Sequence, residues 1–231
     1  MSICAFTSIC EEDAEWIPQY LAEIARLQMP YAVHFDRCSG RTMDAMTKPS
    51  LCIGYTEQRL VEFNETHKQG VFDLVVRNNF DWALAWDMDE IWEKDAPLKI
   101  GQTKLCQTTA DLIDVRWWNL WDNRDHVRID GTFGSGHRAK FYNLRSGQWR
   151  FDHPITNGAK LTHRQANILD ATGLLNCLHA GMMHATHRLA KKARWDRIYS
   201  TALKGDPNPY GFWSYACDES IRPITVRHGY L

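Results

Sequence analysis

Three carboxylates stand close together at the end of a short apolar run, Trp82 to Trp86, in the order Asp87, Asp89 and Glu90. Acids at positions i and i+2 point to opposite faces of an ideal strand, so both reach one ion only where the strand gives way to a loop. A few hard oxygen ligands suit Mg²⁺ or Mn²⁺ shared with a phosphate-bearing substrate, where the metal stabilises a departing diphosphate. The alternative is a solvated acidic edge without a ligand.

The elements that must position these acids are predicted by the apolar pattern around them. A run of this length, preceded by Asn78, Asn79 and Asp81, is typical of a buried strand. Upstream the pattern alternates strand, helix, strand and helix, which predicts an α/β fold with a mostly parallel central sheet and helices on both faces. Ligands of open α/β sheets bind at the carboxyl ends of the strands, so we expect a nucleotide across that edge.

The motif Asp87-Met88-Asp89-Glu90-Ile91-Trp92 resembles the metal motif of nucleotide-sugar glycosyltransferases with the GT-A fold, especially their family-two-like members. In that family the motif reads Asp-x-Asp-Glu, followed by an apolar and an aromatic residue. Residues 2–12, a short apolar strand running into an acidic turn, look like the first unit of the family. Residues 31–40, where an acid ends the second strand, look like the next. The resemblance is strongest in the first part of the chain and weaker beyond it.

The resemblance implies a metal-dependent hexosyltransferase that uses a UDP-sugar as donor substrate and Mn²⁺ or Mg²⁺ as cofactor. The segment Leu178-His179-Ala-Gly181 is similar to one that closes the site in relatives, and imidazole is an acceptable ligand beside carboxylates. The implied metal ligands are Asp87, Asp89 and His179. The residues expected to hold the base, ribose and phosphates of the donor are Thr7, Glu11, Asp36, Lys68, Arg77 and Asp87.

The residue that takes a proton from the acceptor is left open by the sequence. An inverting transferase needs a carboxylate or an imidazole for this step, whereas a retaining one does not. The candidates are Asp152, His153 and Glu90. Relatives often carry a His-Glu pair in this region, but here Pro154 follows His153, so the family's base is not carried over. A zinc hydrolase is disfavoured, because His184 and His187 lack the spacing and the intervening Glu of a zincin helix.

The formal net charge of −1 hides a division between the two halves of the chain. Residues 1–115 hold 10 Lys and Arg against 19 Asp and Glu, while residues 116–231 hold 17 against 9 and eight of the ten histidines. Cations interleaved with aromatic rings suit the phosphates and bases of a nucleic acid. The alternative is that the rings belong to the core and the cations to a solvated helix. The predicted acceptor-binding residues are Trp117, Trp118, Arg138, Lys140, Lys191, Lys192 and Arg194.

These features make a 5-hydroxymethylated pyrimidine in viral, for example bacteriophage, DNA the favoured acceptor. A second possibility within enzymes is a glycosyltransferase that acts on a polysaccharide or lipopolysaccharide. A possibility of another class is a non-catalytic nucleic-acid-binding protein on a degenerate glycosyltransferase scaffold. Retention of Asp87 and Asp89 speaks against the last of these.

Length and composition favour one domain over residues 1–231, with a nucleotide-sugar-binding part at 1–115 and an acceptor-side part at 116–231. Seven cysteines without a CxxC pair argue against a disulfide framework and for a reducing compartment. With no apolar window long enough to span a bilayer, we expect a cytoplasmic protein, in the host cell if viral. In the second half, residues 137–143 and 146–154 are predicted to pair as a hairpin around Ser146-Gly147.

Overall fold

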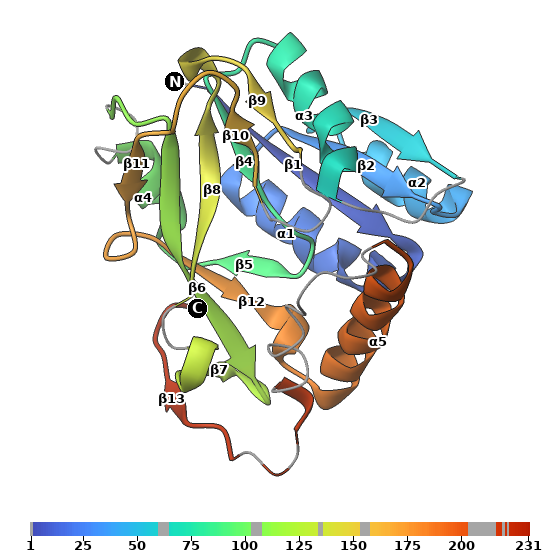
Figure 1. The fold of residues 1–231 in the computed structure, drawn as a ribbon, viewed down its shortest axis with the longest axis vertical. Coiled ribbons are helices and arrows are strands. Elements are labelled where there is room, and N and C mark those ends of the chain that lie inside the picture. Colours follow the sequence, from blue (N-terminus) through green and yellow to red (C-terminus); the bar gives the residue numbers. More distant parts are fainter. Residues whose placement is uncertain are drawn as a thin grey trace.

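The computed structural model describes residues 2–59, 65–102, 108–133, 136–152, 158–202, 216–218, 220 and 222–231. Its first half alternates strands and helices, as the sequence predicts (Figure 1). The strands are β1 (Ile3–Cys10), β2 (Tyr31–Asp36), β3 (Cys52–Gln58) and β4 (Trp82–Ala85), and they lie parallel in the order β3-β2-β1-β4. The helices between them are α1 (Ile17–Leu27), α2 (Gly40–Thr47) and α3 (Lys68–Arg77).

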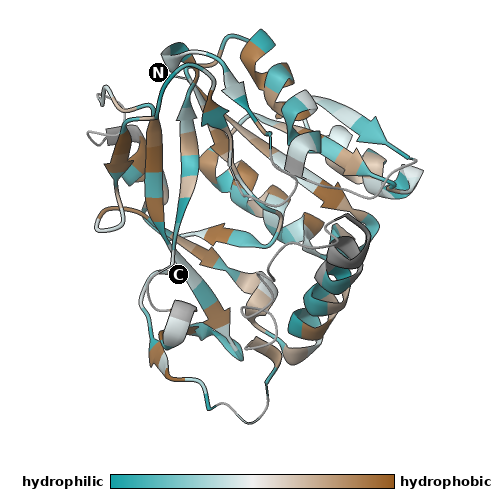
Figure 2. Cartoon of the chain, viewed as in Figure 1, coloured by the Kyte–Doolittle hydropathy of each residue, from teal (hydrophilic) through white to brown (hydrophobic). Residues whose placement is uncertain are grey.

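The helices cover both faces of this parallel part because its central strands, β1 and β2, are buried on both sides. Alternate residues of β1 point to opposite faces of the sheet. Cys4 and Phe6 share a buried cluster with the apolar side of α3, whereas Ala5 and Ile9 share another with α1 and α2. Brown, apolar residues accordingly follow the central strands in Figure 2. This packing fixes the carboxyl ends of β1, β2 and β4 at one edge of the sheet.

The second half continues the same sheet with mixed strand directions. Strand β8 (His137–Asn143) lies antiparallel between β4 and β6 (Leu112–Trp121), and β12 (Asn176–His179) runs parallel to β6. Strand β5 (Glu90–Trp92) pairs antiparallel with β12, so that His179 lies opposite Glu90. Residues far apart in the chain are thereby brought beside the acidic motif.

The remaining elements lie around this sheet. Helix α4 (Ala96–Gln102) follows β5, and α5 (Ala185–Ala202), where hydrophilic residues predominate, follows β12 (Figures 1 and 2). Strands β7 (Asn123–Arg128) and β13 (Thr225–Arg227) extend the sheet beyond β6, and β11 (Ile168–Asp170) pairs parallel with β6. No helix in the described parts of the chain is long and apolar enough to cross a membrane.

The α/β fold is confirmed, but the predicted hairpin is wrong. Strand β8 pairs with β4 and β6, while β9 (Trp149–Arg150) pairs with β10 (Lys160–Leu161) in a separate two-stranded sheet. The Ser146-Gly147 turn is present, but Lys140 and Phe141 are buried in β8, which lies between β4 and β6. Long-range burial therefore decides the strand partners, not the local turn chemistry.

The buried His34 on β2 predicts a specific loss of stability in acid. Its side chain is 4% exposed, and burial lowers its pKa from 6.5 to about 4. The unfolded chain protonates this histidine at a higher pH than the folded chain does. The stability that the neutral His34 ring contributes is therefore lost as the pH falls from 6.5 to about 4.

The free energy of unfolding of the wild type is expected to fall by up to about 3 kcal/mol more than that of His34→Gln over this pH range. Urea unfolding at several pH values measures the difference, with exposed His163→Gln as the control. Parallel pH profiles of wild type and His34→Gln would contradict it.

Candidate active site

The acidic motif forms a tight turn between β4 and β5. Trp86 is fully buried, its backbone N–H donates to the carbonyl of Phe6, and its indole N–H donates to the carbonyl of Glu90 at 3.1 Å. The backbone N–H of Glu90 donates to the carbonyl of Asp87. The strand therefore ends immediately before the acids, and the turn spreads their side chains in different directions.

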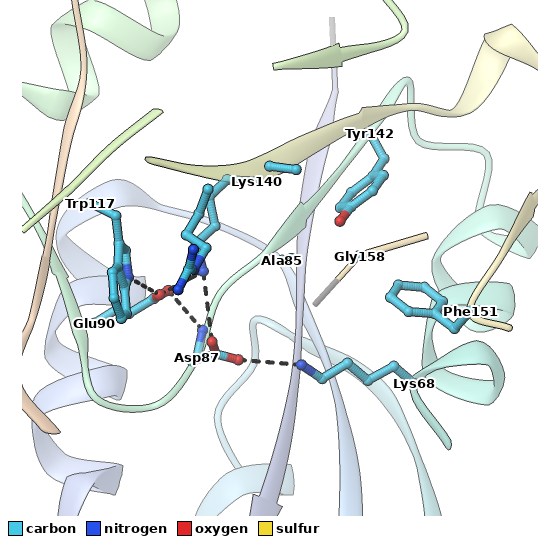
Figure 3. Close-up of a pocket in the computed structure, with 11 residues that line it drawn as sticks. Lys68, Ala85, Asp87, Glu90, Trp117, Lys140, Tyr142, Phe151 and Gly158 are labelled. Carbon is cyan, nitrogen blue, oxygen red and sulfur yellow. Dashed lines mark hydrogen bonds and ion pairs between the residues drawn. The ribbon is translucent and has the colours of Figure 1, made fainter. Parts of the chain in front are cut away.

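Glu90 is the buried centre of this turn. Its carboxylate accepts hydrogen bonds from Lys140 Nζ at 2.6 and 2.7 Å, from Trp117 Nε1 at 2.8 Å and from the backbone N–H of Asp87 at 3.0 Å (Figure 3). Burial raises the pKa of Glu90, and Lys140 opposes that shift. With its oxygens engaged and shielded from solvent, Glu90 holds Lys140 and the turn in place. The structure argues against its predicted role as the base.

Asp87 faces a pocket at the carboxyl end of β4. Its side chain is 47% exposed, with Lys68 Nζ at 3.6 Å and Lys140 Nζ at 3.7 Å from its two oxygens (Figure 3). Partial burial would raise the pKa of Asp87, but Lys68 and Lys140 outweigh it and lower the pKa to about 2. Asp87 is thus an ionised acid that reaches the pocket surface.

The pocket has cationic walls and an aromatic side. Lys68 enters from the start of α3, and Arg138 and Lys140 enter from β8. Arg138 lies over the ring of Trp117, 4.6 Å from its centre, and makes no carboxylate ion pair of 4 Å or less within the described part of the chain. The described residues that line it are Lys68, Ala85, Asp87, Glu90, Trp117, Arg138, Ala139, Lys140, Tyr142, Phe151 and Gly158 (Figure 3). Among these residues, three cations against two carboxylates make the pocket suited to an anion.

Asp89 lies in a second cluster beside the pocket. It is 6% exposed, and its Oδ2 contacts both Lys191 Nζ, from α5, and His179 Nε2, the latter at 3.1 Å. The other ring nitrogen of His179 contacts Asn119 Oδ1 at 2.9 Å, and its ring stacks on Trp117. Burial alone would raise the pKa of Asp89, but Lys191 and His179 hold it well below its ordinary value. Burial lowers the pKa of His179, which favours the neutral imidazole.

The predicted metal ligands do not fit a preformed metal centre. The structure does bring Asp89 and His179 together, as the sequence predicts, but the ammonium group of Lys191 contacts both of them. Asp87 belongs to the other cluster, with Lys68 and Lys140. No group of three or more His, Cys, Asp or Glu arranged to hold a metal ion occurs among the residues that the structure describes.

Of the predicted donor-binding residues, Lys68 and Asp87 line the pocket, whereas Thr7, Glu11 and Asp36 belong to β1, the turn after it and the end of β2. Thr7 on β1 has a buried hydroxyl without a hydrogen-bond partner in the described structure. Glu11 accepts from the backbone and side chain of Ser39 and so holds the start of α2, and Asp36 at the end of β2 pairs with Arg37. A nucleotide contact at any of these residues stays a prediction.

The structure places Arg77, a predicted phosphate contact, away from the pocket. Lys68 begins α3 beside Asp87, whereas Arg77 ends the same helix and is exposed. A rise of about 1.5 Å per residue puts the two ends more than ~10 Å apart. Helix α3 leads back to the amino end of β4, so Arg77 lies at the edge of the sheet opposite the acids.

The predicted acceptor-binding residues do not form one basic surface. Trp117, Arg138 and Lys140 line the pocket, but Trp118 points to the opposite side, where its indole donates to Asn176 and its ring stacks on Tyr230. The three predicted cations of α5 each pair with an acid: Lys191 with Asp89, Lys192 with Asp196, and Arg194 with Asp13. Trp118 therefore does not share a face with Trp117, because neighbouring residues of a strand face opposite sides.

Of the other two base candidates, only Asp152 is in the described part of the chain, and His153 lies outside it. Asp152 is exposed, has Lys160 at 3.7 Å, and follows Phe151, which lines the pocket. It therefore remains the candidate whose carboxylate is open to an acceptor near the pocket.

Three contributors were missed by sequence reasoning. Asn119 orients His179, and Tyr142 and Phe151 form the apolar side of the pocket. Asn119 gives one signal, since it is a polar residue at a buried position of the predicted strand. The two rings gave no signal that separates them from ordinary core residues.

Gly181 explains how Lys191 reaches Asp89, and it predicts a sensitive position. A Cβ on Gly181 would collide with both Asp89 Oδ2 and Lys191 Nζ, whereas one on Gly173 would meet nothing within 4 Å. Gly181→Ala is therefore expected to separate the pair and lower the free energy of unfolding by about 2–4 kcal/mol. Gly173→Ala, the matched control, should change it by less than about 0.5 kcal/mol. Equal unfolding midpoints in urea for the two variants would contradict this packing.

Comparison with known proteins finds similarity in structure but no match in sequence. No protein-family model matches the sequence, and no curated protein matches it. Among solved structures, the fold is similar to S. aureus TarS 1-349, with 10% identity over 94% of this chain and 79% of that one and a TM-score of 0.45. A putative nucleotide-diphospho-sugar transferase from Desulfovibrio desulfuricans G20 has 9% identity over 89% and 92%, with a TM-score of 0.46. HddC from Yersinia pseudotuberculosis has 10% identity over 78% and 93%, with a TM-score of 0.47. At these identities and TM-scores the likenesses say nothing about the function of this chain.

Proposed function

We propose that this protein is a glycosyltransferase that moves a sugar from a UDP-sugar to a hydroxyl acceptor. The observation that carries the proposal is the pocket at the carboxyl end of β4, where Lys68, Arg138 and Lys140 surround the ionised Asp87. Ligands of α/β sheets bind at this edge, and planar or point cations are the usual partners of phosphate oxygens. The anionic part of such a donor is its diphosphate.

In the proposed reaction, the acceptor oxygen bonds to the anomeric carbon while the bond from that carbon to the β-phosphate oxygen breaks. The bonding electrons go to the phosphate oxygen, so negative charge develops on the departing UDP. Lys68 and Arg138, on opposite walls of the pocket, stabilise that charge. In an inverting reaction the hydroxyl proton passes to Asp152, the exposed candidate beside the pocket. Asp87 is placed to accept hydrogen bonds from hydroxyl groups of the donor.

The acceptor is proposed from the sequence rather than from contacts around the pocket. The favoured acceptor is a 5-hydroxymethylated pyrimidine in DNA, and the alternative is a polysaccharide or lipopolysaccharide. Ion pairs within the protein engage Lys140, Lys191, Lys192 and Arg194, so Arg138 is the one predicted acceptor-binding cation without a carboxylate ion pair among the described residues. The alternative to binding of the diphosphate by these cations is binding through the divalent metal that the resemblance implies.

The experiment incubates the purified protein with a panel of UDP-sugars, with and without Mn²⁺, and with DNA containing 5-hydroxymethylcytosine or 5-hydroxymethyluracil or with glycan acceptors. UDP release and the mass of the digested nucleosides or glycans are measured. A hexose-sized gain on an acceptor is the expected result, and its carrier distinguishes DNA from glycan. Absence of UDP release with every donor, together with salt-sensitive DNA binding, would instead support the non-catalytic alternative.

A further inference from the structure

Each acid of the motif already has a lysine partner. Lys140 contacts both oxygens of Glu90 and lies 3.7 Å from Asp87, Lys68 lies 3.6 Å from Asp87, and Lys191 contacts Asp89. Three ammonium groups therefore offset three carboxylates. The positive and negative charges are therefore equal in number, and the motif has no excess negative charge that would attract a cation.

The lysines also occupy the positions from which the acids would bind a metal ion. Lys191 Nζ lies against Asp89 Oδ2 and 3.0 Å from His179 Nε2, so it contacts both predicted ligands, which also contact each other at 3.1 Å. Gly181 is required for this close approach, because a Cβ there would collide with both partners of the ion pair. A divalent ion at Asp89 would have to displace Lys191 and then face the positive charges of Lys68 and Lys140.

The pocket offers cations to a phosphate directly. Arg138 lies over Trp117 and donates to the carbonyl of His137, and its guanidinium has no carboxylate within ion-pair distance among the described residues. Lys68 enters from the other side, with 11% of its side chain exposed (Figure 3). The two groups present fixed positive charge at the same opening, where a diphosphate needs it.

Resting on the proposed function, we infer that the protein binds the donor diphosphate through Lys68 and Arg138 without a divalent metal, and that Lys191 fills the place of the metal at Asp89. The acidic motif then holds the lysines in position rather than coordinating an ion. The motif resembles a metal motif in its residue types, but the charged groups around it are those of a site that binds an anion.

Two measurements on the full chain test the inference. Calorimetric titration with UDP is expected to give the same dissociation constant, within about twofold, in EDTA and in millimolar Mn²⁺. Electron paramagnetic resonance titration of Mn²⁺ alone is expected to show no binding to the wild type tighter than millimolar. UDP binding that is tenfold or more tighter with Mn²⁺, or Mn²⁺ binding at micromolar concentrations, overturns the inference and leaves the glycosyltransferase proposal standing.

Failure of the proposed function looks different. If the proposed function is wrong, UDP does not bind in either buffer. The Mn²⁺ titration still tests whether the acids bind a metal ion. The variant Lys191→Met sharpens that titration, because removing the ammonium frees Asp89 and is expected to raise Mn²⁺ affinity at least tenfold. Lys192→Met, whose side chain pairs with Asp196 on the same helix, is the matched control and should not change it. Unchanged Mn²⁺ affinity in a folded Lys191→Met would show that Lys191 does not guard a metal site.

Discussion

Lys140→Met is expected to lower the free energy of unfolding by about 3–5 kcal/mol, because it leaves the carboxylate of Glu90 buried without its cation. Glu90 is 0% exposed, and the Lys140 side chain is 5% exposed. The trapped charge, rather than the lost contact, causes most of the effect. Urea unfolding at neutral pH measures it.

The reason for the loss is tested by removing the second charge. In the double variant Lys140→Met with Glu90→Gln, no ionised group is left buried at the turn, so part of the lost stability is expected to return. Lys160→Met is the control, because Lys160 is 65% exposed and its partner Asp152 is exposed as well. A loss below about 1 kcal/mol for Lys140→Met would contradict the account of a tightly paired buried ion.

Lys68→Met is expected to weaken UDP binding by about tenfold to a hundredfold, the size of one charge-assisted hydrogen bond. Lys68 begins α3 at the pocket edge and lies 3.6 Å from Asp87. Removing Lys68 takes positive charge away from the pocket opening. The negative charge of Asp87 then repels the diphosphate more strongly. Isothermal titration calorimetry in EDTA measures the dissociation constant.

The control for this prediction is Lys48→Met. Lys48 is 74% exposed and pairs with Asp44 on α2, away from the pocket lining. It should leave UDP affinity within about twofold of the wild type. If both variants bound UDP equally well, the diphosphate would not lie at Lys68.

The parallel half of the fold was predictable because its signals are local. Apolar strands alternate with helical segments, and this order requires a parallel sheet with covered faces. The pairing of β8 with β4 and β6 was not predictable in this way, because the turn at Ser146-Gly147 indicates a hairpin that long-range burial overrides. Sequence periodicity shows that a segment is a strand, but not which strand lies beside it.

The candidate site shows the same limit. The position of the acids at the end of β4 followed from the apolar run before them. Their partners did not, because Lys140 is 50 residues from Glu90 and Lys191 is 102 residues from Asp89. Only the sheet order brings β8, β12 and α5 to the motif. The pattern therefore predicts the carboxylates, and it marks the lysines as donor or acceptor contacts but not as the ion-pair partners of these acids.

Orientation accounts for the individual misses. Arg77 is basic and precedes β4, but it ends a helix that runs back from the pocket edge. Trp118 adjoins Trp117 in sequence, yet its side chain lies on the other face of β6. Both residues have the predicted chemical type and lie in the predicted element, and each points the wrong way for the predicted role.

A crystal structure of the protein with UDP bound would test the proposed donor site most directly. We expect the diphosphate to lie in the pocket at the carboxyl end of β4, with its oxygens within hydrogen-bond distance of Lys68 Nζ and the Arg138 guanidinium. A diphosphate bound elsewhere on the chain, with these two side chains and Asp87 not in contact with it, would show that the pocket is not the donor site.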